Sequence, residues 1–87
     1  MRKIEIGKVY RHFKGNYYFV ENIAYDSETT SPLVVYKPIY NREDNKTLWV
    51  RPLDMFLSQI DPNRPDNKFS QKYRFTLCED LSINYIK

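Results

Sequence analysis

Apolar and polar residues alternate over most of the chain, which is the pattern of β-strands that turn one face toward a core. Segments of this kind, or short apolar runs of similar length, cover residues 9–13, 17–25, 33–36, 47–51 and 73–77. Aromatic and β-branched residues are frequent in them, and these residue types favour strands. The pattern therefore predicts a mainly β fold.

Two local signals refine this prediction. Lys14-Gly15-Asn16 separates the first two segments, and Gly and Asn tolerate the backbone of a tight turn, so residues 9–25 are predicted to form a hairpin. One later segment has a helical period, with apolar residues at i, i+3, i+4 and i+7: Leu53, Phe56, Leu57 and Ile60. We expect about two turns of helix there, begun by Pro52 and stopped by Asp61-Pro62. Residues 81–86 are expected to form a last short strand or to fray.

Roughly four to six short strands and one short α-helix favour a small bent antiparallel sheet or a partial barrel of SH3-like architecture. The chain has 87 residues, which is enough for one modest core. We therefore expect residues 1–87 to form a single domain. A two-domain enzyme with a separate cofactor domain is excluded by this length.

Composition narrows the function classes. The net charge of +3, from 14 basic and 11 acidic residues, predicts weak attraction to polyanions unless the charges gather on one face. Cys78 is the one cysteine, which excludes an intrachain disulfide and points to the cytoplasm. The sequence has no zinc-ligand spacing, no Gly-rich phosphate loop and no apolar run near the roughly 18 residues of a membrane span. We expect no metal, no cofactor and no membrane partner.

Trp49 and Arg51 are candidate binding residues because they lie two apart in a predicted strand and so share a face. If Leu48 and Val50 face the core, Trp49 and Arg51 present an aromatic ring beside a guanidinium at a partly wet surface. Such a pair suits a planar or anionic group, through stacking and bidentate hydrogen bonds. In the structural alternative, Trp49 caps the barrel and Arg51 pairs with a local carboxylate.

Arg11 and His12 are neighbours in the first strand, so one of them must point to the more buried side. As a catalyst, His12 would need a carboxylate or a nucleophile within hydrogen-bond reach, and Ser27 and Glu28 are the plausible source. A small hydrolase or transferase that uses His12 with Glu28 is therefore one alternative. In the other, His12 is a hydrogen-bonded structural residue, and Ser27 and Glu28 cap and order their loop.

We interpret the chain as a binding module without catalytic activity, for a small anionic or planar ligand or a peptide segment. The expected ligand-binding residues are Arg11, His12, Ser27, Glu28, Tyr36, Trp49 and Arg51. The arginines would supply charge-assisted hydrogen bonds, the aromatic rings would stack, and Glu28 would orient an arginine or accept from the ligand. A single-stranded nucleic acid is a further alternative, because aromatic residues lie among basic ones. The modest net charge predicts that such binding would be weak and salt-sensitive.

An ordered set of short motifs runs through the first two thirds of the chain. They are Gly7-x-Val9-Tyr10-Arg11-His12-Phe13-Lys14-Gly15-Asn16, Tyr18-x-Val20, Ala24, Ser27-Glu28-Thr29, Leu33-Val34-Val35-Tyr36, Ile39-Tyr40, Leu48-Trp49-Val50-Arg51-Pro52 and Met55-Phe56. In this combination the chain resembles the small, mostly bacterial family called domain of unknown function 1653. The likeness covers about residues 7–60, and about residues 72–77 resemble the family's closing strand. The resemblance supports the fold and the location of the site, and it implies no activity.

Overall fold

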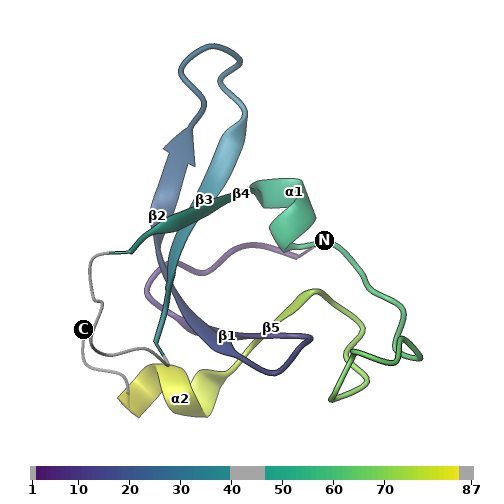
Figure 1. Cartoon of the computed structure of the whole chain (residues 1–87). Helices are drawn as coiled ribbons and strands as arrows, with labels where there is room; N and C mark the ends of the chain where they lie inside the picture. The colour runs from purple at the N-terminus through teal and green to yellow at the C-terminus, as the bar shows by residue number, and fades with distance from the viewer. Residues whose placement is uncertain (1, 40–46, 85–87) are drawn as a thin grey trace.

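The structure, a computed structural model, describes residues 2–39 and 47–84. These residues form a five-stranded antiparallel sheet with two short helices (Figure 1). The elements are β1 (Val9–His12), β2 (Tyr17–Tyr25), β3 (Pro32–Pro38), β4 (Trp49–Pro52), α1 (Leu53–Phe56), β5 (Phe75–Leu77) and α2 (Glu79–Asn84). The strand order is β4-β3-β2-β1-β5. The mainly β prediction is confirmed, and the sheet is open, because its edge strands β4 and β5 do not pair to close a barrel.

β1 and β2 form the predicted hairpin, in a register that pairs Val9 with Phe19. Gly15 in the turn has a φ of +110°, which residues with a Cβ rarely adopt. Its N–H donates to the His12 carbonyl at 2.8 Å. The turn therefore places the end of β1 close to the start of β2.

β2 and β3 form a second, longer hairpin that ends at the Tyr25–Pro32 pair. Asp26 holds its turn, because one carboxylate oxygen accepts the N–H groups of Glu28 at 2.8 Å and Thr29 at 3.2 Å. Figure 1 shows the tip of this hairpin projecting beyond the rest of the sheet. The turn residues consequently lie away from the core.

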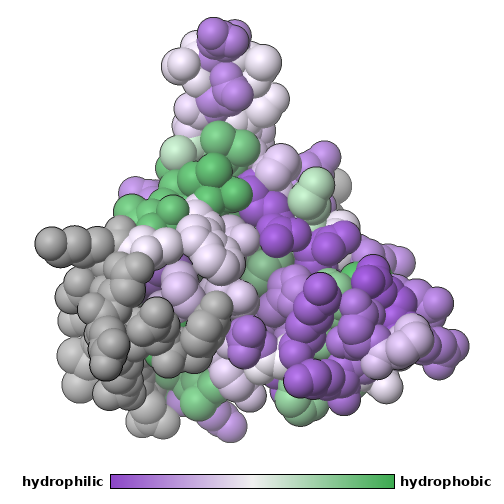
Figure 2. Space-filling view, in the orientation of Figure 1, coloured by the Kyte–Doolittle hydropathy of each residue, from purple (hydrophilic) through white to green (hydrophobic). Residues whose placement is uncertain are grey.

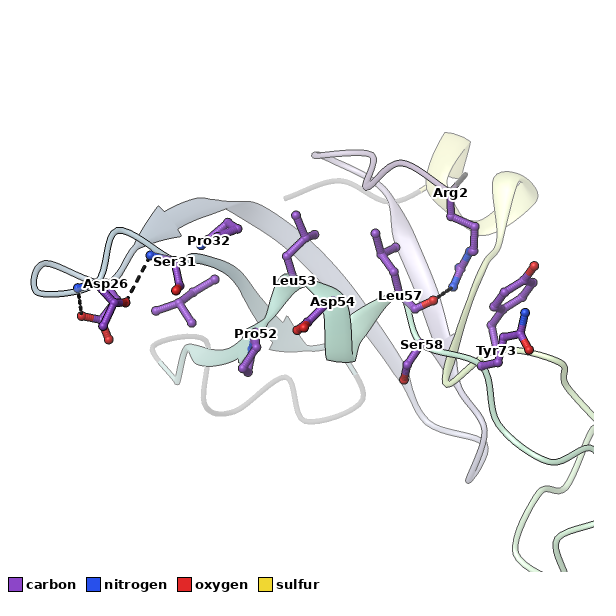
Figure 3. A pocket seen from close by; sticks show the side chains of 13 residues that line it. Arg2, Asp26, Ser31, Pro32, Pro52, Leu53, Asp54, Leu57, Ser58 and Tyr73 are labelled. Carbon is purple, nitrogen blue, oxygen red and sulfur yellow. Dashed lines mark hydrogen bonds between the residues drawn. The ribbon is translucent and has the colours of Figure 1, made fainter.

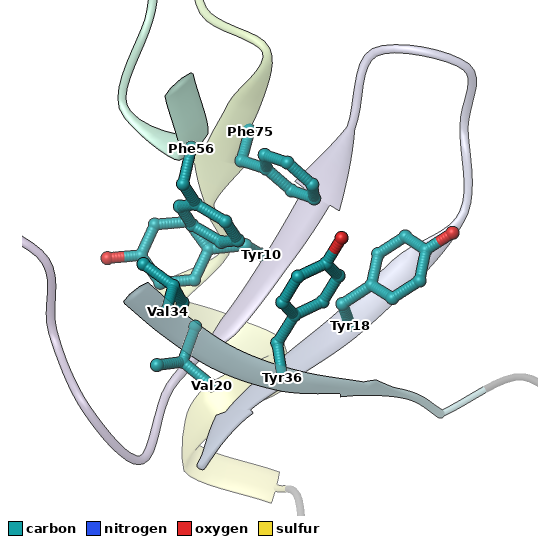
Figure 4. Packing of buried hydrophobic residues seen from close by; sticks show 7 residues of the cluster. All are labelled: Tyr10, Tyr18, Val20, Val34, Tyr36, Phe56 and Phe75. Atoms are coloured by element: carbon teal, nitrogen blue, oxygen red, sulfur yellow. The ribbon is translucent and has the colours of Figure 1, made fainter. Parts of the chain in front are cut away.

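The core lies on one face of the sheet and is largely aromatic (Figure 4). Its buried members are Tyr10, Tyr18, Val20, Val34, Tyr36, Phe56 and Phe75. Phe56 from α1 stacks on Phe75 from β5, with ring centroids 3.9 Å apart and an interplanar angle of 5°. Tyr10 and Tyr36 meet Phe56 edge-on, each at 5.4 Å. One ring of α1 therefore joins the edge strand β5 to the middle of the sheet.

α1 is shorter than predicted. The expectation of about two turns over residues 52–60 is wrong in length, because α1 has a single turn. The backbone N–H and the hydroxyl of Ser58 both donate to the Met55 carbonyl, at 3.1 and 2.6 Å, and this tight turn ends the helix. The predicted apolar face still packs inward, since Phe56 and Ile60 are buried.

The chain after β5 forms a helix, α2, so the prediction of a last strand or a frayed end over 81–86 is wrong for the described part of that segment. Two acidic residues in the first turn of α2 are favoured by the helix dipole. The Ser82 hydroxyl accepts the Val9 N–H at 2.7 Å and donates to the Cys78 carbonyl at 2.8 Å, which attaches α2 to β1. Neither of the two helices described is long and apolar enough to cross a membrane.

The register of β4 decides which of its side chains face the core. Trp49 lies opposite Tyr36 of β3, and residues directly opposite each other share a face. Trp49 and Arg51 therefore lie on the core side of the sheet. Leu48 and Val50 are 55% and 58% exposed instead, and Figure 2 shows hydrophobic surface over β4. The arrangement in which Leu48 and Val50 face the core is therefore not the one that the structure adopts.

Candidate functional site

A small pocket of about 320 Å³ lies beside the aromatic core, where β1 turns into β2. Its walls come from both hairpins, β4, the segment after α1 and β5. The lining residues are His12, Phe13, Lys14, Asn16, Tyr18, Tyr36, Trp49, Arg51, Arg64, Arg74 and Phe75. Of these described residues, four carry a positive charge and none carries a negative one, so the pocket is suited to anions.

Trp49 is the exposed ring of an aromatic wall. Its ring centroid lies 5.8 Å from that of Tyr18 and 6.1 Å from that of Tyr36, yet the residue is 42% exposed. In Figure 4 the hydroxyls of Tyr18 and Tyr36 lie on one side of the core cluster, opposite the hydroxyl of Tyr10. A ring that two neighbours hold in place, but that still reaches solvent, is a preformed stacking surface.

Arg51 and Arg74 are each fixed at Nε by a hydroxyl group. Arg51 Nε donates to the Tyr36 hydroxyl and Arg74 Nε donates to the Ser58 hydroxyl, both at 3.2 Å. One terminal nitrogen of Arg51 also contacts the Met55 sulfur at 3.8 Å. Within residues 2–39 and 47–84, neither guanidinium has a carboxylate in salt-bridge contact. Both arginines are thus held in position while their charge is not neutralised by a described neighbour.

Arg64, the third arginine of the pocket, is paired. Its Nε and Nη2 donate to the two carboxylate oxygens of Asp66, each at 2.9 Å. Burial, followed by the charges of Arg51 and Arg64, lowers the pKa of the Arg74 guanidinium, which nevertheless stays protonated at neutral pH. The pocket therefore combines two arginines that have charge to offer with one that is already engaged.

His12 contributes a neutral ring. Its Nδ1 accepts the N–H of Lys14 at 3.1 Å, so the proton of the neutral imidazole is on Nε2. Burial, followed by the positive charges of Arg51, Arg74 and Lys14, lowers the pKa of His12 to about 4. At neutral pH His12 can donate one hydrogen bond and adds no charge to the pocket.

The depressed pKa of His12 predicts a pH dependence of stability. The unfolded chain takes up a proton near the ordinary value of 6.5 and the folded chain only near 4, so stability falls as the pH drops from about 6.5 to about 4 and levels off below. The full difference would be about 3 kcal/mol, and solvent screening of this partly exposed ring reduces it to about 1 to 2 kcal/mol. Denaturant unfolding at several pH values should show this loss, and a His12→Gln variant should lack it.

His12 is the one histidine in the chain, so its ring C2 proton can be followed directly by NMR. The resonance should titrate with a midpoint near 4 in the folded protein. A midpoint near 6.5 would mean that His12 is neither desolvated nor close to the arginines.

Four of the seven predicted site residues come together in the pocket, namely His12, Tyr36, Trp49 and Arg51. Arg11 does not, because successive residues of a strand point to opposite faces. Its Nε donates to the Gln71 side chain at 2.6 Å, and its guanidinium lies 3.9 Å from the centroid of the Phe69 ring. Arg11 therefore fastens the segment before β5 to the other side of β1.

Ser27 and Glu28 also lie outside the pocket, in the turn at the tip of the β2–β3 hairpin. The His12 ring is 6.3 Å from that of Tyr18, and β2 continues from there for seven more residues to Tyr25. At about 3.3 Å per residue this is about 23 Å, so Glu28 is far beyond direct or one-water contact with His12. The geometry does not support His12–Glu28 catalysis, and it agrees with the loop-capping alternative for Ser27 and Glu28.

The sequence interpretation missed five polar lining residues: Lys14, Asn16, Tyr18, Arg64 and Arg74. Arg74 had a recognisable signal, because it lies between the aromatic residues Tyr73 and Phe75 inside the strand predicted for residues 73–77. Arg64 had none, since it lies in a segment rich in Pro, Asn and Asp that reads as a linker. The pocket exists because this segment folds back against the β1–β2 turn, where the Lys68 N–H donates to the Phe13 carbonyl.

A larger open groove of about 1280 Å³ runs along the other side of α1. Figure 3 shows its residues following one another from the β2–β3 turn, past α1, to Arg2 and Tyr73. Leu53 and Leu57 supply apolar surface, and Arg2 is already engaged, because its terminal nitrogens donate to two backbone carbonyls. The charged lining residues of the groove are of both signs, Arg2 against Asp26 and Asp54, whereas those of the smaller pocket are all positive. We therefore take the smaller pocket as the candidate site. No group of three or more metal-ligating side chains occurs in the described parts of the chain.

The fold and the pocket define a small, mainly β domain with a cationic, aromatic-lined site. The family model described as "Protein of unknown function (DUF1653)" matches residues 8–77, and the chain belongs to this family. It is similar to the crystal structure of a protein belonging to DUF1653 from Bordetella bronchiseptica, with a TM-score of 0.67 and 28% sequence identity over 87% of this chain and 88% of that chain. A comparison with curated proteins gave no match. The resemblance suggested by the sequence motifs is confirmed.

Proposed function

We propose that this chain is a cytoplasmic binding module, without catalytic activity, for a small anionic ligand that carries a planar group. The observation that carries the proposal is the pair Arg51 and Arg74, which are anchored through Nε beside the exposed ring of Trp49. The free thiol of Cys78 is compatible with a reducing compartment. The pocket volume of about 320 Å³ is at the small end for ligand sites, which favours a small molecule over a peptide segment.

Four of the lining residues have a definite role in this proposal. Arg51 and Arg74 supply charge-assisted hydrogen bonds to the anion, and Trp49 stacks on its planar part. His12 adds a neutral N–H donor, which binds an anion without the desolvation cost of another buried charge. The low pKa of His12 follows first from burial and then from the same cations that would attract the ligand.

Trp49 is the one tryptophan of the chain, so its fluorescence reports on the pocket directly. We expect benzoate and phenyl phosphate to change the emission of Trp49 and to raise the melting temperature, because a ligand that binds only the folded state stabilises it. Equilibrium titrations at low salt measure both effects. If neither compound changes the emission or the melting temperature, the proposed function is wrong.

A matched pair of variants tests whether the compounds bind in this pocket. Ser58→Asp puts a carboxylate next to Arg74, with which Ser58 already shares a hydrogen bond, and should weaken binding of both compounds by about tenfold. Ser27→Asp makes the same chemical change at the hairpin tip and should leave binding within about twofold, because a distant exposed charge is screened. Equal losses in the two variants would show that only the net charge matters, and would contradict the proposed site.

A further inference from the structure

The two unneutralised arginines offer more donors than a carboxylate can accept. A guanidinium has five N–H groups. The hydrogen bonds of the Arg51 side chain use Nε and one terminal nitrogen, and that of Arg74 uses Nε alone. Within the described chain, one terminal nitrogen of Arg51 and both of Arg74 therefore have no acceptor. A carboxylate presents two oxygens to such donors, whereas a phosphate group presents three.

The charge of the pocket also favours a phosphate group over a carboxylate. Arg64 is neutralised by Asp66 and His12 is neutral, which leaves Arg51 and Arg74 as the arginines with charge to offer and Lys14 at the rim. Two guanidinium groups match a dianion better than a monoanion. A phosphate monoester carries about −1.5 to −2 charges at neutral pH, while a carboxylate or a phosphodiester carries one.

The ring and the volume limit what the phosphate is attached to. Trp49 is exposed and held edge-on by Tyr36, with an interplanar angle of 85°, so it can take one further ring by stacking. Arg51 belongs to the same strand and the same face as Trp49, which places the charged group and the stacking surface side by side. A pocket of about 320 Å³ has room for a single small molecule of this kind.

We infer that the pocket recognises a phosphate monoester joined to an aromatic ring, the chemistry of a nucleoside monophosphate. This inference rests on the anion-binding function proposed above and names its ligand class. The phosphate lies between Arg51 and Arg74, and the ring lies on Trp49. The dianion faces His12, whose protonation it favours, so the NMR midpoint of His12 rises when the pocket is filled.

The experiment compares ligands that share one ring. Phenyl phosphate, methyl phenyl phosphate and benzoate differ in charge and in the number of free oxygens, and inorganic phosphate lacks the ring. At about pH 7.5, above the second pKa of about 6 of a phosphate monoester, phenyl phosphate should bind at least about tenfold more tightly than each of the other three. Trp49 fluorescence gives the affinities, and the His12 C2 proton should shift its midpoint upward with phenyl phosphate.

Arg74→Gln tests where the phosphate lies. This variant should bind phenyl phosphate and benzoate about equally, and Lys72→Gln, at an exposed position, should keep the full preference. Adenosine 5′-monophosphate and a 5′-phosphorylated single-stranded trinucleotide distinguish the sources of the ligand. We expect the mononucleotide to bind at least as tightly as the trinucleotide; tighter binding of the trinucleotide would overturn the assignment to a small molecule.

The outcomes separate this inference from the proposed function. If benzoate or the phosphodiester, methyl phenyl phosphate, binds as tightly as phenyl phosphate, the inferred ligand class is wrong, while the proposed anion-binding function still holds. If inorganic phosphate binds as tightly as phenyl phosphate, the stacking on Trp49 is wrong. A preference that survives Arg74→Gln means that the phosphate is held elsewhere. If no compound binds, the proposed function fails together with the inference.

Discussion

Replacing Phe56 by Ala is expected to lower the free energy of unfolding by about 3 to 5 kcal/mol. Phe56 is 0% exposed and stacks on Phe75 with ring centroids 3.9 Å apart. It also meets Tyr10 and Tyr36 edge-on. Because α1 has a single turn, no neighbouring helical turn can close the cavity that the substitution leaves. Urea unfolding followed by Trp49 fluorescence measures the loss.

Met55 provides the control, since it lies in the same short helix and is 44% exposed. Met55→Ala removes a large side chain at the surface and should cost no more than about 1 kcal/mol. A loss below about 1 kcal/mol for Phe56→Ala would contradict the stacked arrangement of Phe56 and Phe75. Equal losses in both variants would mean that any shortened side chain in α1 destabilises the protein, and that the burial of the Phe56 ring is not the cause.

Local patterns were sufficient for much of this fold. The turn chemistry around Gly15 predicts the first hairpin, and the period of Phe56 and Ile60 identifies the buried face of α1. The length of α1 was not predictable in the same way. It ends because Ser58 turns back onto the Met55 carbonyl, a side-chain hydrogen bond that competes with the helix and leaves no trace in the apolar period.

α2 illustrates a second limit of the local pattern. Residues 79–84 are too few to form a stable helix alone, and their composition also suits an extended or frayed end. The Ser82 hydroxyl accepts the N–H of Val9 across 73 positions of sequence, and this bond belongs to the tertiary structure. Contacts of this kind override weak local preference.

The candidate site was predictable only where one strand carries it. The period of a strand predicts that Trp49 and Arg51 share a face, and in β4 they do. The direction of that face depends on the pairing of Trp49 with Tyr36, which the alternation within β4 cannot supply. Arg64 and Arg74 lie in the pocket because segments that are distant in sequence fold against the β1–β2 turn. Glu28 lies far from the pocket because β2 extends well past the core.

Arg51→Lys is expected to weaken binding of phenyl phosphate by about 10- to 100-fold, which corresponds to the loss of a hydrogen bond to a charged group. Lysine keeps the positive charge but has no planar fork, so it cannot be anchored by the Tyr36 hydroxyl and still reach the anion with two donors. The free energy of unfolding should change by no more than about 1 kcal/mol, the worth of one neutral hydrogen bond. Fluorescence titration and denaturant unfolding of the same preparation give both numbers.

Arg64→Lys makes the same substitution in the same pocket and is the matched comparison. Arg64 already gives two hydrogen bonds to Asp66, so its guanidinium has less to offer the anion, and the affinity should fall by less than about threefold. If Arg64→Lys weakens binding as much as Arg51→Lys does, the anion is held by the Arg64 side of the pocket. If Arg51→Lys instead costs about 2 kcal/mol or more of stability while binding is unchanged, Arg51 is a structural residue. The contrast between the two arginines therefore depends on a single physical difference, the presence of a carboxylate that already satisfies one of them.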